Sequence, residues 1–146
     1  MTLDIRPLVD GLSVAPQVTE EDIRAAHAAG FRSIVNNRPD GEEPGQLPSA
    51  EAARIAAGLG MAYVYMPAIG PTLDAVSDDF GKALAALPGP VLAHCRSGTR
   101  CTILWALAEA KAGTSSGEEI FRTAAAAGYD LSSYAALIDR YAQSRV

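Results

Sequence analysis

Apolar positions follow two different patterns along this chain of 146 residues. Short apolar runs bounded by Gly, Pro, Asn or Asp predict strands, and stretches whose apolar side chains recur every three or four positions predict helices. The predicted strands lie at 3–6, 12–15, 31–36, 62–66 and 91–94. The predicted helices lie at 20–29, from Pro48 onward, after Thr72, and at 101–111, 116–127 and 131–143.

Local signals set several of these boundaries. Thr19 with Asp22 three residues later is typical of a capping box, and Gly30 marks a helix stop. The stretch 101–111 is apolar nearly all round, which predicts a buried helix. Strands and helices alternate from residue 31 to residue 112. This order predicts an α/β fold with three layers, in which a mostly parallel sheet of about four or five strands is flanked by helices.

The composition narrows the class of protein. The chain is 49% hydrophobic and 20% charged, so we expect one globular domain over residues 1–146. Its net charge of -5 argues against nucleic-acid binding, because no basic surface is available to neutralise phosphates. No apolar run is long enough to cross a membrane, and the first residues lack a signal peptide, so we expect a cytoplasmic protein. The two cysteines fit neither a disulfide framework nor a zinc site, and we expect no metal and no cofactor.

Six residues carry most of the candidate chemistry: Cys-Arg-Ser-Gly-Thr-Arg at 95–100. They follow the strand 91–94 and lead directly into a helix, so backbone N–H groups and the helix dipole converge on the turn. Arg100 adds a forked cation that suits an oxyanion. In this field Cys95 is expected to have a depressed pKa and to act as a nucleophilic thiolate. The alternative is an inert, buried cysteine next to a surface arginine.

Other residues near this loop are candidates for anion binding. The backbone of Arg96, Ser97, Gly98 and Thr99 would form the anion-binding ring, and the Arg96 side chain is either a second anion contact or a solvated charge. Arg38 follows the strand 31–36, and the carboxyl ends of parallel strands share one edge of a sheet. Arg38 is therefore predicted either to contact substrate or to order its own loop by pairing with Asp40 or Glu42.

Two stretches carry a resemblance to known families. His94-Cys95 followed by Ser97–Arg100 resembles the active-site loops of the protein tyrosine phosphatase and rhodanese superfamilies. Together with residues 31–42, which read Phe-Arg-Ser-Ile-Val-Asn-Asn-Arg-Pro-Asp-Gly-Glu, it is similar to the phosphatase-like family of beta-lactamase-hydrolase-like proteins. The resemblance implies a dual-specificity-phosphatase fold. It also implies a possible persulfide dioxygenase partner, because the family occurs alone or joined to such enzymes of sulfide detoxification.

Loop spacing and the general acid separate the activities that this resemblance implies. Four residues lie between Cys95 and Arg100, as in rhodanese sulfurtransferases, whereas tyrosine phosphatases have five. Phosphatases of this fold carry an aspartate acid on the loop that here spans 66–72, which contains no carboxylate. Asp74 is the nearest candidate, and its alternative role is to stabilise a helix N-terminus.

Three hypotheses follow. The first is a rhodanese-type sulfurtransferase, in which Cys95 takes a sulfane sulfur from thiosulfate or glutathione persulfide and passes it to a thiol or cyanide. The second is a phosphatase acting through a phosphocysteine, with Arg100 binding the phosphate and Asp74 as a displaced acid. The third is a non-catalytic module that binds an anion or a persulfide.

Two neighbours of the nucleophile have open roles. His94 either shapes the loop through a hydrogen bond, as the resemblance implies, or is a core histidine at a strand end. Cys101 stands where the family resemblance leads us to expect serine. It is predicted either to resolve an oxidised Cys95 as a disulfide or to be a small buried residue.

Overall fold

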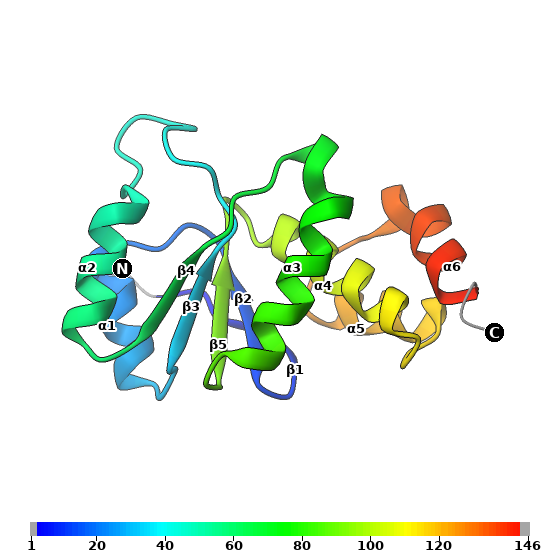
Figure 1. The fold of residues 1–146 in the computed structure, drawn as a ribbon, viewed down its shortest axis with the longest axis horizontal. Coiled ribbons are helices and arrows are strands. Elements are labelled where there is room, and N and C mark those ends of the chain that lie inside the picture. The colour runs from blue at the N-terminus through cyan, green and yellow to red at the C-terminus, as the bar shows by residue number, and fades with distance from the viewer. Residues whose placement is uncertain (1–2, 144–146) are drawn as a thin grey trace.

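A five-stranded sheet lies between two groups of helices (Figure 1) in the computed structural model, which describes residues 3–143. The strands follow the spatial order β1-β2-β5-β3-β4, in which β1 and β2 are antiparallel and all other neighbours are parallel. They are β1 (Arg6–Val9), β2 (Leu12–Ala15), β3 (Ser33–Asn36), β4 (Ala62–Tyr65) and β5 (Val91–His94). The predicted three-layer α/β fold is therefore confirmed.

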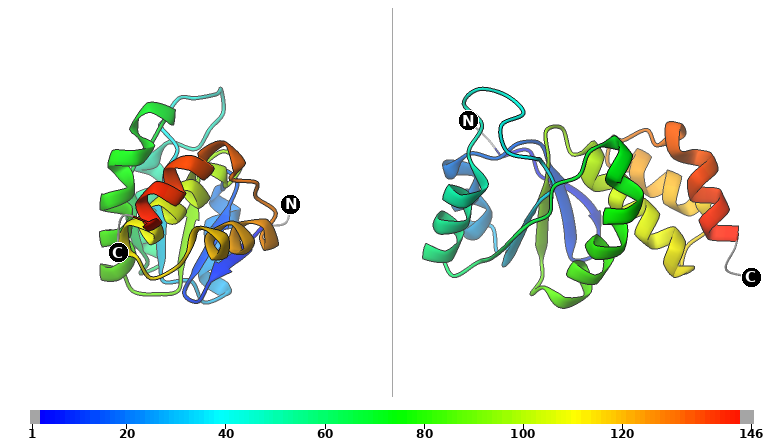
Figure 2. Two further views of the ribbon diagram at one scale, coloured as in Figure 1. Left: turned by 90° about the vertical axis from the view of Figure 1, so that its right-hand side faces the viewer. Right: turned by 45° about the horizontal axis from the view of Figure 1, so that its top comes forward.

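The helices divide between the two faces of the sheet (Figures 1 and 2). One face is covered by α1 (Glu20–Ala28) and α2 (Ser49–Gly58). The other carries α3 (Leu73–Ala86) and α4 (Thr99–Ala112), and α4 in turn packs against α5 (Gly117–Ala126) and α6 (Ala135–Gln143). Two short 3-10 helices, η1 (Gly70–Thr72) and η2 (Ser132–Tyr134), precede α3 and α6.

Each face of the sheet has its own apolar core. The core under α1 and α2 is built around Ile23, Ile34 and Leu92. The core on the other side is centred on α4, whose apolar sequence is matched by burial on nearly all sides, as predicted. Its buried residues are Cys101, Thr102, Ile103, Leu104, Trp105, Ala106, Leu107 and Ala110. The start of α4 is thus held firmly, which fixes the loop before it.

Some boundaries differ from those predicted. The first strand is Arg6–Val9 instead of 3–6, because the tight turn at Asp10-Gly11 pairs Val9 directly with Leu12. Gly11 adopts a φ of 82°, a left-handed conformation that suits glycine in such a turn.

Helix starts account for the remaining differences. Helix α4 begins at Thr99, two residues before the predicted start, and the last predicted helix begins as η2. Thr72 makes no side-chain cap, because its hydroxyl is bonded to the backbone of Ile69 instead. The capping boxes at Thr19 and Ser116 form with both of their hydrogen bonds.

The sheet brings two loops to one end. Strands β3 and β5 are parallel neighbours, with Asn36 opposite His94, so both chains leave the sheet at the same edge. The Asn37 N–H donates to the His94 carbonyl at 2.8 Å and extends the pairing by one residue. The loop between β3 and α2 therefore rises at the carboxyl end of the sheet (cyan in Figure 1), beside the turn that joins β5 to α4.

Candidate active site

The turn after β5 folds its backbone around the Cys95 sulfur. Cys95 follows the strand directly, and the Gly98 N–H donates to the Cys95 Sγ at 3.1 Å. Gly98 has a φ of 95°, and a side chain at this position would collide with the ring and hydroxyl of Tyr129. Both constraints require glycine here. The chain then enters α4 at Thr99, so the N-terminus of a buried helix lies next to the thiol.

Hydrogen bonds to Cys95 stabilise its charged form. The largest contribution comes from the Cys101 thiol, and the backbone N–H groups of Cys101, Gly98 and Ser97 add to it. These donors outweigh burial, which acts in the opposite direction, and they lower the pKa of Cys95 to about 5. At neutral pH the sulfur is therefore a thiolate, the form that acts as a nucleophile.

Arg100 keeps one edge of its guanidinium unused. Its Nη1 donates to Glu42 Oε2 at 2.9 Å and to the Ala68 carbonyl at 3.0 Å, and its Nη2 donates to Glu42 Oε1 at 2.7 Å. A guanidinium has five N–H donors, so the Nε–H and the second Nη2–H have no partner among residues 3–143. These two donors lie on the same edge and can bind two oxygens of one oxyanion.

Glu42 holds this arginine in place. The hydrogen bonds from Arg100, and secondarily those from Arg38, lower the pKa of Glu42 to about 2. The carboxylate is therefore ionised at any physiological pH, and it fixes the end of the Arg100 side chain without being able to donate a proton. Glu42 raises the pKa of Arg100 in turn. The sequence pattern predicts Glu42 only as a partner of Arg38, and its contact with Arg100 has no local signal in the chain.

Arg38 is brought to the same cluster but not to an open surface. Its side chain has no exposed area, and its nitrogens donate to Glu42 at 2.9 Å, to Glu43 at 3.1 Å and to Gln17 at 3.2 Å. With all three nitrogens engaged, Arg38 orders the loop between β3 and α2. This arrangement matches the second of the two roles predicted for it, and the structure does not place it where an anion could reach it.

The remaining loop residues divide between backbone and surface roles. The Arg96 side chain is exposed to solvent. The Ser97 hydroxyl donates to the Thr99 hydroxyl at 3.0 Å and accepts the Thr99 N–H at 3.3 Å. The Thr99 N–H is therefore used inside the turn, and the anion-binding ring is smaller than the predicted one.

His94 is a buried residue at the end of β5. Burial is the main influence on its ring and lowers the pKa of His94 to about 4. The imidazole is therefore neutral at physiological pH. Neither ring nitrogen has a hydrogen-bond partner among residues 3–143, so the structure does not show the predicted loop-shaping hydrogen bond, and the burial of the ring agrees with the alternative role of a core histidine.

Asp74 does not lie at the loop. Its carboxylate accepts hydrogen bonds from the Tyr141 hydroxyl at 2.6 and 2.9 Å and pairs with the Lys111 Nζ at 2.8 Å. Lys111 lies near the far end of α4, about 18 Å along the helix from Thr99 at 1.5 Å per residue. Lys111, followed by Tyr141, lowers the pKa of Asp74, so the carboxylate stays ionised and holds no proton to give at neutral pH. The structure thus places the predicted displaced acid away from Cys95.

Tyr129 supports the loop from a distant part of the chain. Its hydroxyl donates to the Ser97 carbonyl at 3.1 Å, and its ring packs against Gly98. It lies between α5 and η2, where the sequence pattern shows only a helix stop at Gly128. No local signal in the sequence indicates this contact.

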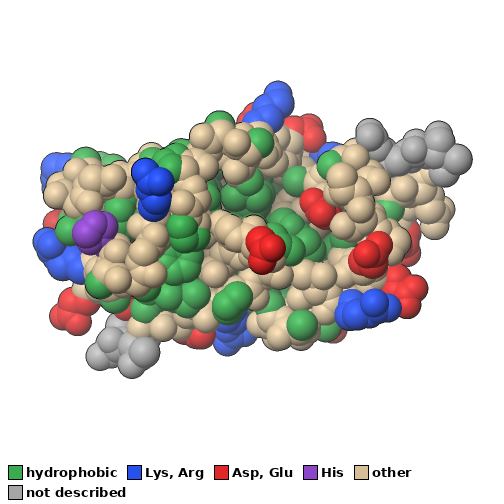
Figure 3. Space-filling view, turned by 90° about the horizontal axis from the view of Figure 1, so that it is seen from below, with side chains coloured by type: hydrophobic (Ala, Val, Ile, Leu, Met, Phe, Trp, Pro, Cys, Tyr) green, Lys and Arg blue, Asp and Glu red, His purple; other side chains and the backbone are tan. Residues whose placement is uncertain are grey.

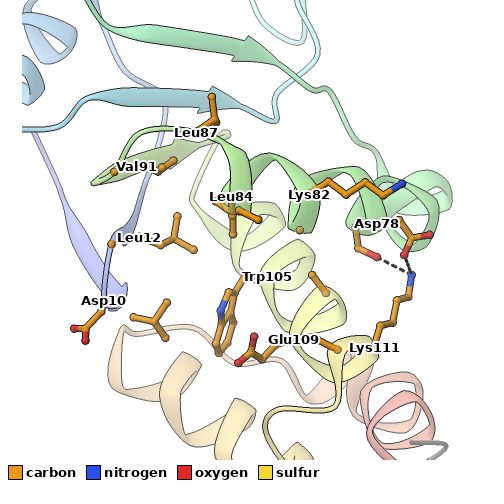
Figure 4. Close-up of a pocket in the computed structure, with 18 residues that line it drawn as sticks. Asp10, Leu12, Asp78, Lys82, Leu84, Leu87, Val91, Trp105, Glu109 and Lys111 are labelled. Atoms are coloured by element: carbon orange, nitrogen blue, oxygen red, sulfur yellow. Dashed lines mark hydrogen bonds and ion pairs between the residues drawn. The ribbon is translucent and has the colours of Figure 1, made fainter.

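A separate cavity lies away from this loop. It measures about 860 Å³ and is located between the β1–β2 turn, α3 and α4, with Leu12, Leu84 and Trp105 on its walls (Figure 4). Seen from below, hydrophobic side chains gather in the middle of this side of the molecule (Figure 3). Cys95 does not line the cavity.

Residues 3–143 hold neither a metal-binding cluster nor a membrane-spanning helix. No three His, Cys, Asp or Glu side chains are placed to hold a metal ion there. In the same residues, no helix is both long and apolar enough to cross a membrane.

The fold and the loop define a class of protein. A five-stranded α/β sheet that presents a cysteine, a turn of N–H groups and an arginine on the next helix is the architecture of a protein-tyrosine-phosphatase-like domain. Residues 4–112 match the family model described as beta-lactamase hydrolase-like protein, phosphatase-like domain. The chain belongs to this family, as the resemblance implied.

Individual relatives agree with this assignment. A beta-lactamase hydrolase-like protein from Agrobacterium fabrum is 40% identical over 121 residues, which are 82% of this chain and 28% of that protein. One from Xylella fastidiosa is 41% identical over 126 residues, 85% of this chain and 29% of that protein. The chain thus spans less than a third of the curated relatives it matches.

Solved structures share the fold. The crystal structure of a candidate phosphatase from Neisseria meningitidis has a TM-score of 0.84 and 31% identity, and the match covers 94% of this chain and 97% of that one. The catalytic core of the PP-IP phosphatase SIW14 from S. cerevisiae has a TM-score of 0.64 and 19% identity, covering 94% of this chain and 84% of that one. This second likeness concerns the fold alone.

Proposed function

We propose that this chain is a cysteine-dependent phosphatase in which Cys95 attacks the phosphorus of a bound phosphate ester. The observation that carries the proposal is that one short loop holds the Cys95 thiolate, the turn N–H group that bonds to it, and Arg100, which is in electrostatic contact with that thiolate and keeps two N–H donors without a partner among residues 3–143. These donors suit the charge that builds up on the oxygens of a transferring phosphoryl group. The family and its phosphatase neighbour support the same choice.

The reaction has two steps. The Cys95 sulfur forms a bond to phosphorus while the bond from phosphorus to the leaving oxygen breaks, which gives a phosphocysteine. Water then attacks phosphorus, releases inorganic phosphate and restores the thiolate. Arg100 and the loop N–H groups hold the phosphoryl oxygens throughout. Cys95 has no exposed surface in the structure, so substrate entry requires a local opening around the sulfur.

The surroundings of the loop define a class of substrate. A general acid protonates the leaving oxygen in phosphatases that cleave alkyl phosphates. Here residues 66–72 contain no carboxylate, Asp74 is held by Lys111, and Glu42 stays ionised. The proposed substrates are therefore esters whose leaving group departs as a stable anion, such as aryl phosphates and phosphoric anhydrides.

A direct test is a comparison of para-nitrophenyl phosphate with an alkyl phosphate such as phosphoserine. We expect turnover of the aryl ester, slow or absent turnover of the alkyl ester, and one phosphoryl group on Cys95 in the intact mass after acid quenching. Cys95→Ser should show neither turnover nor this mass. Absence of both from the wild-type protein would refute the proposal.

A sulfurtransferase is the second candidate, although the comparisons support the phosphatase instead of this first expectation. One observation favours it: four residues separate Cys95 from Arg100, the rhodanese count, and sulfur transfer requires no general acid. In that reaction the Cys95 thiolate takes the outer sulfur of thiosulfate and releases sulfite. The same mass measurement separates the candidates, since a gain of one sulfur, discharged by cyanide, would identify the sulfurtransferase.

A further inference from the structure

The chain contains two cysteines, and the structure places both in one buried cluster. Cys101 is the third residue of α4, one turn after Gly98, whose N–H is bonded to the Cys95 sulfur. Both side chains are fully buried in the same apolar cluster, and the Cys101 thiol is the strongest influence on the charge of the Cys95 sulfur. Two sulfur atoms from the strand end and the first helical turn therefore meet inside the protein.

The two thiols differ in chemistry. Burial, followed by the neighbouring Cys95, raises the pKa of Cys101, so Cys101 stays protonated while Cys95 is a thiolate. An acidic thiolate is the form that reacts with peroxides. The proposed phosphatase reaction uses Cys101 only as a hydrogen-bond donor, which a serine could also provide. Unlike a serine hydroxyl, however, a thiol at this position can form a disulfide.

We propose that Cys101 is the resolving thiol for oxidised Cys95, so that a hydroperoxide converts the pair into a reversible disulfide. The Cys95 thiolate attacks the peroxide oxygen, forms a sulfenic acid and releases hydroxide, or the alkoxide of an organic peroxide. The Cys101 sulfur then attacks the Cys95 sulfur; its proton and the hydroxyl of the sulfenic acid leave as water. The two cysteines together lose two electrons, and the peroxide gains them.

The burial of Cys101 determines its partner. Both cysteines lack exposed surface, so a small peroxide reaches Cys95 only through the local opening that substrate entry also requires, and Cys101 is already beside Cys95 when the sulfenic acid forms. The disulfide would occupy the sulfur that acts as the nucleophile and would prevent its further oxidation to sulfinic and sulfonic acids, which thiols do not reverse. The proposal requires only a reactive Cys95 thiolate, and it is independent of which group that thiolate transfers.

The experiment compares the wild-type protein with Cys101→Ser, which keeps a hydroxyl donor of similar size. Both proteins are treated with excess hydrogen peroxide at neutral pH, then with dithiothreitol, and intact mass and free thiols are measured at each stage. Cys95→Ser serves as the control for oxidation elsewhere. Near-ultraviolet circular dichroism checks that Cys101→Ser is folded, and Cys101→Ala is the substitute if it is not.

We expect the wild-type protein to lose two hydrogen atoms and both free thiols, and to recover both fully with dithiothreitol. Cys101→Ser should instead gain two or three oxygen atoms on Cys95 and stay oxidised. The proposal is overturned if the wild-type protein gains these oxygens as fast as Cys101→Ser, or if neither protein is oxidised. Because the readout is a mass, this result stands apart from the outcome with para-nitrophenyl phosphate.

Discussion

The two ends of the central sheet differ in what their charged groups do. At the amino end of β5, a cavity of about 860 Å³ has mostly apolar walls, and the Lys111 ammonium at its edge is already paired with Asp78 and with Asp74, which lies outside the lining. At the carboxyl end, the Cys95 thiolate is enclosed, and two N–H donors of the nearby Arg100 have no partner among residues 3–143. This difference shows that hydrogen-bond donors without a partner, and not the volume of a cavity, indicate the candidate active site of this molecule.

Substitutions at the two ends should therefore have different consequences. Changes at the carboxyl end should alter anion binding and reaction rate with little loss of stability. Changes at the amino end should alter stability and leave the chemistry intact. Turnover of para-nitrophenyl phosphate measures the first effect, and thermal unfolding measures the second.

Arg100→Lys should have the largest effect. Lysine keeps the positive charge but loses the paired donors that grip two oxygens, so we expect kcat/KM to fall by about 10²- to 10³-fold. Arg96→Lys is the matched control, because its side chain is exposed, and it should retain nearly full activity. If both variants kept wild-type activity, Arg100 would not bind the substrate, and the contrast between the two ends would fail.

The pH dependence should follow the thiolate. The pKa of Cys95 is lowered to about 5, so the thiolate fraction is nearly complete at pH 7 and falls about tenfold per unit below pH 5. Since this folded-state pKa is lower than that of the free thiol, the associated stability is present at high pH and declines as pH falls toward 5. The ultraviolet thiolate absorbance of the wild-type protein minus that of Cys95→Ser measures the titration. A midpoint near that of a free thiol would remove the basis for a nucleophile.

The features that the sequence predicts correctly are those formed by residues close together in the chain. The spacing of apolar side chains predicted the strands and helices of the sheet fold. The stretch from Cys95 to Arg100 predicted that a strand end, a turn and a helix start follow one another. The contacts that complete the site are not local: Arg100 meets Glu42 across 58 positions and Ala68 across 32, and Tyr129 meets Ser97 across 32. Such pairs depend on how loops from different strands pack, which a hydrophobic pattern does not encode.

The Asp74 hypothesis shows the same limit. A carboxylate in the first turn of a helix after β4 satisfied every local requirement for a displaced acid. The structure gives it Lys111 and Tyr141 as partners, both from the C-terminal parts of later helices. Only the packing of α3 against α4 and α6 decides this pairing, and residue types alone do not reveal it.

Glu42→Gln should have an intermediate effect. Glutamine can accept only one of the two Arg100 hydrogen bonds and carries no charge, so Arg100 should lose its fixed position and kcat/KM should fall by about tenfold. Glu43→Gln is the matched control, because Glu43 contacts Arg38 but not Arg100. Tighter binding of inorganic phosphate by Glu42→Gln would contradict this role and show that Glu42 competes with the anion.

Asp74→Asn should have the smallest effect on chemistry. Its partners are Lys111 near the end of α4 and Tyr141 in α6, so kcat/KM for the aryl ester should stay within about twofold of the wild-type value, as expected for a distant, uncoupled site. Loss of a partly exposed ion pair should reduce the free energy of unfolding by about 0.5 to 1 kcal/mol. Asp78→Asn removes the other carboxylate from Lys111 and should behave alike. If Asp74→Asn, but not Asp78→Asn, lowered kcat/KM for phosphoserine by more than about tenfold and left kcat/KM for the aryl ester unchanged, Asp74 would be the general acid. The residues at the two ends of the sheet would then belong to one active site.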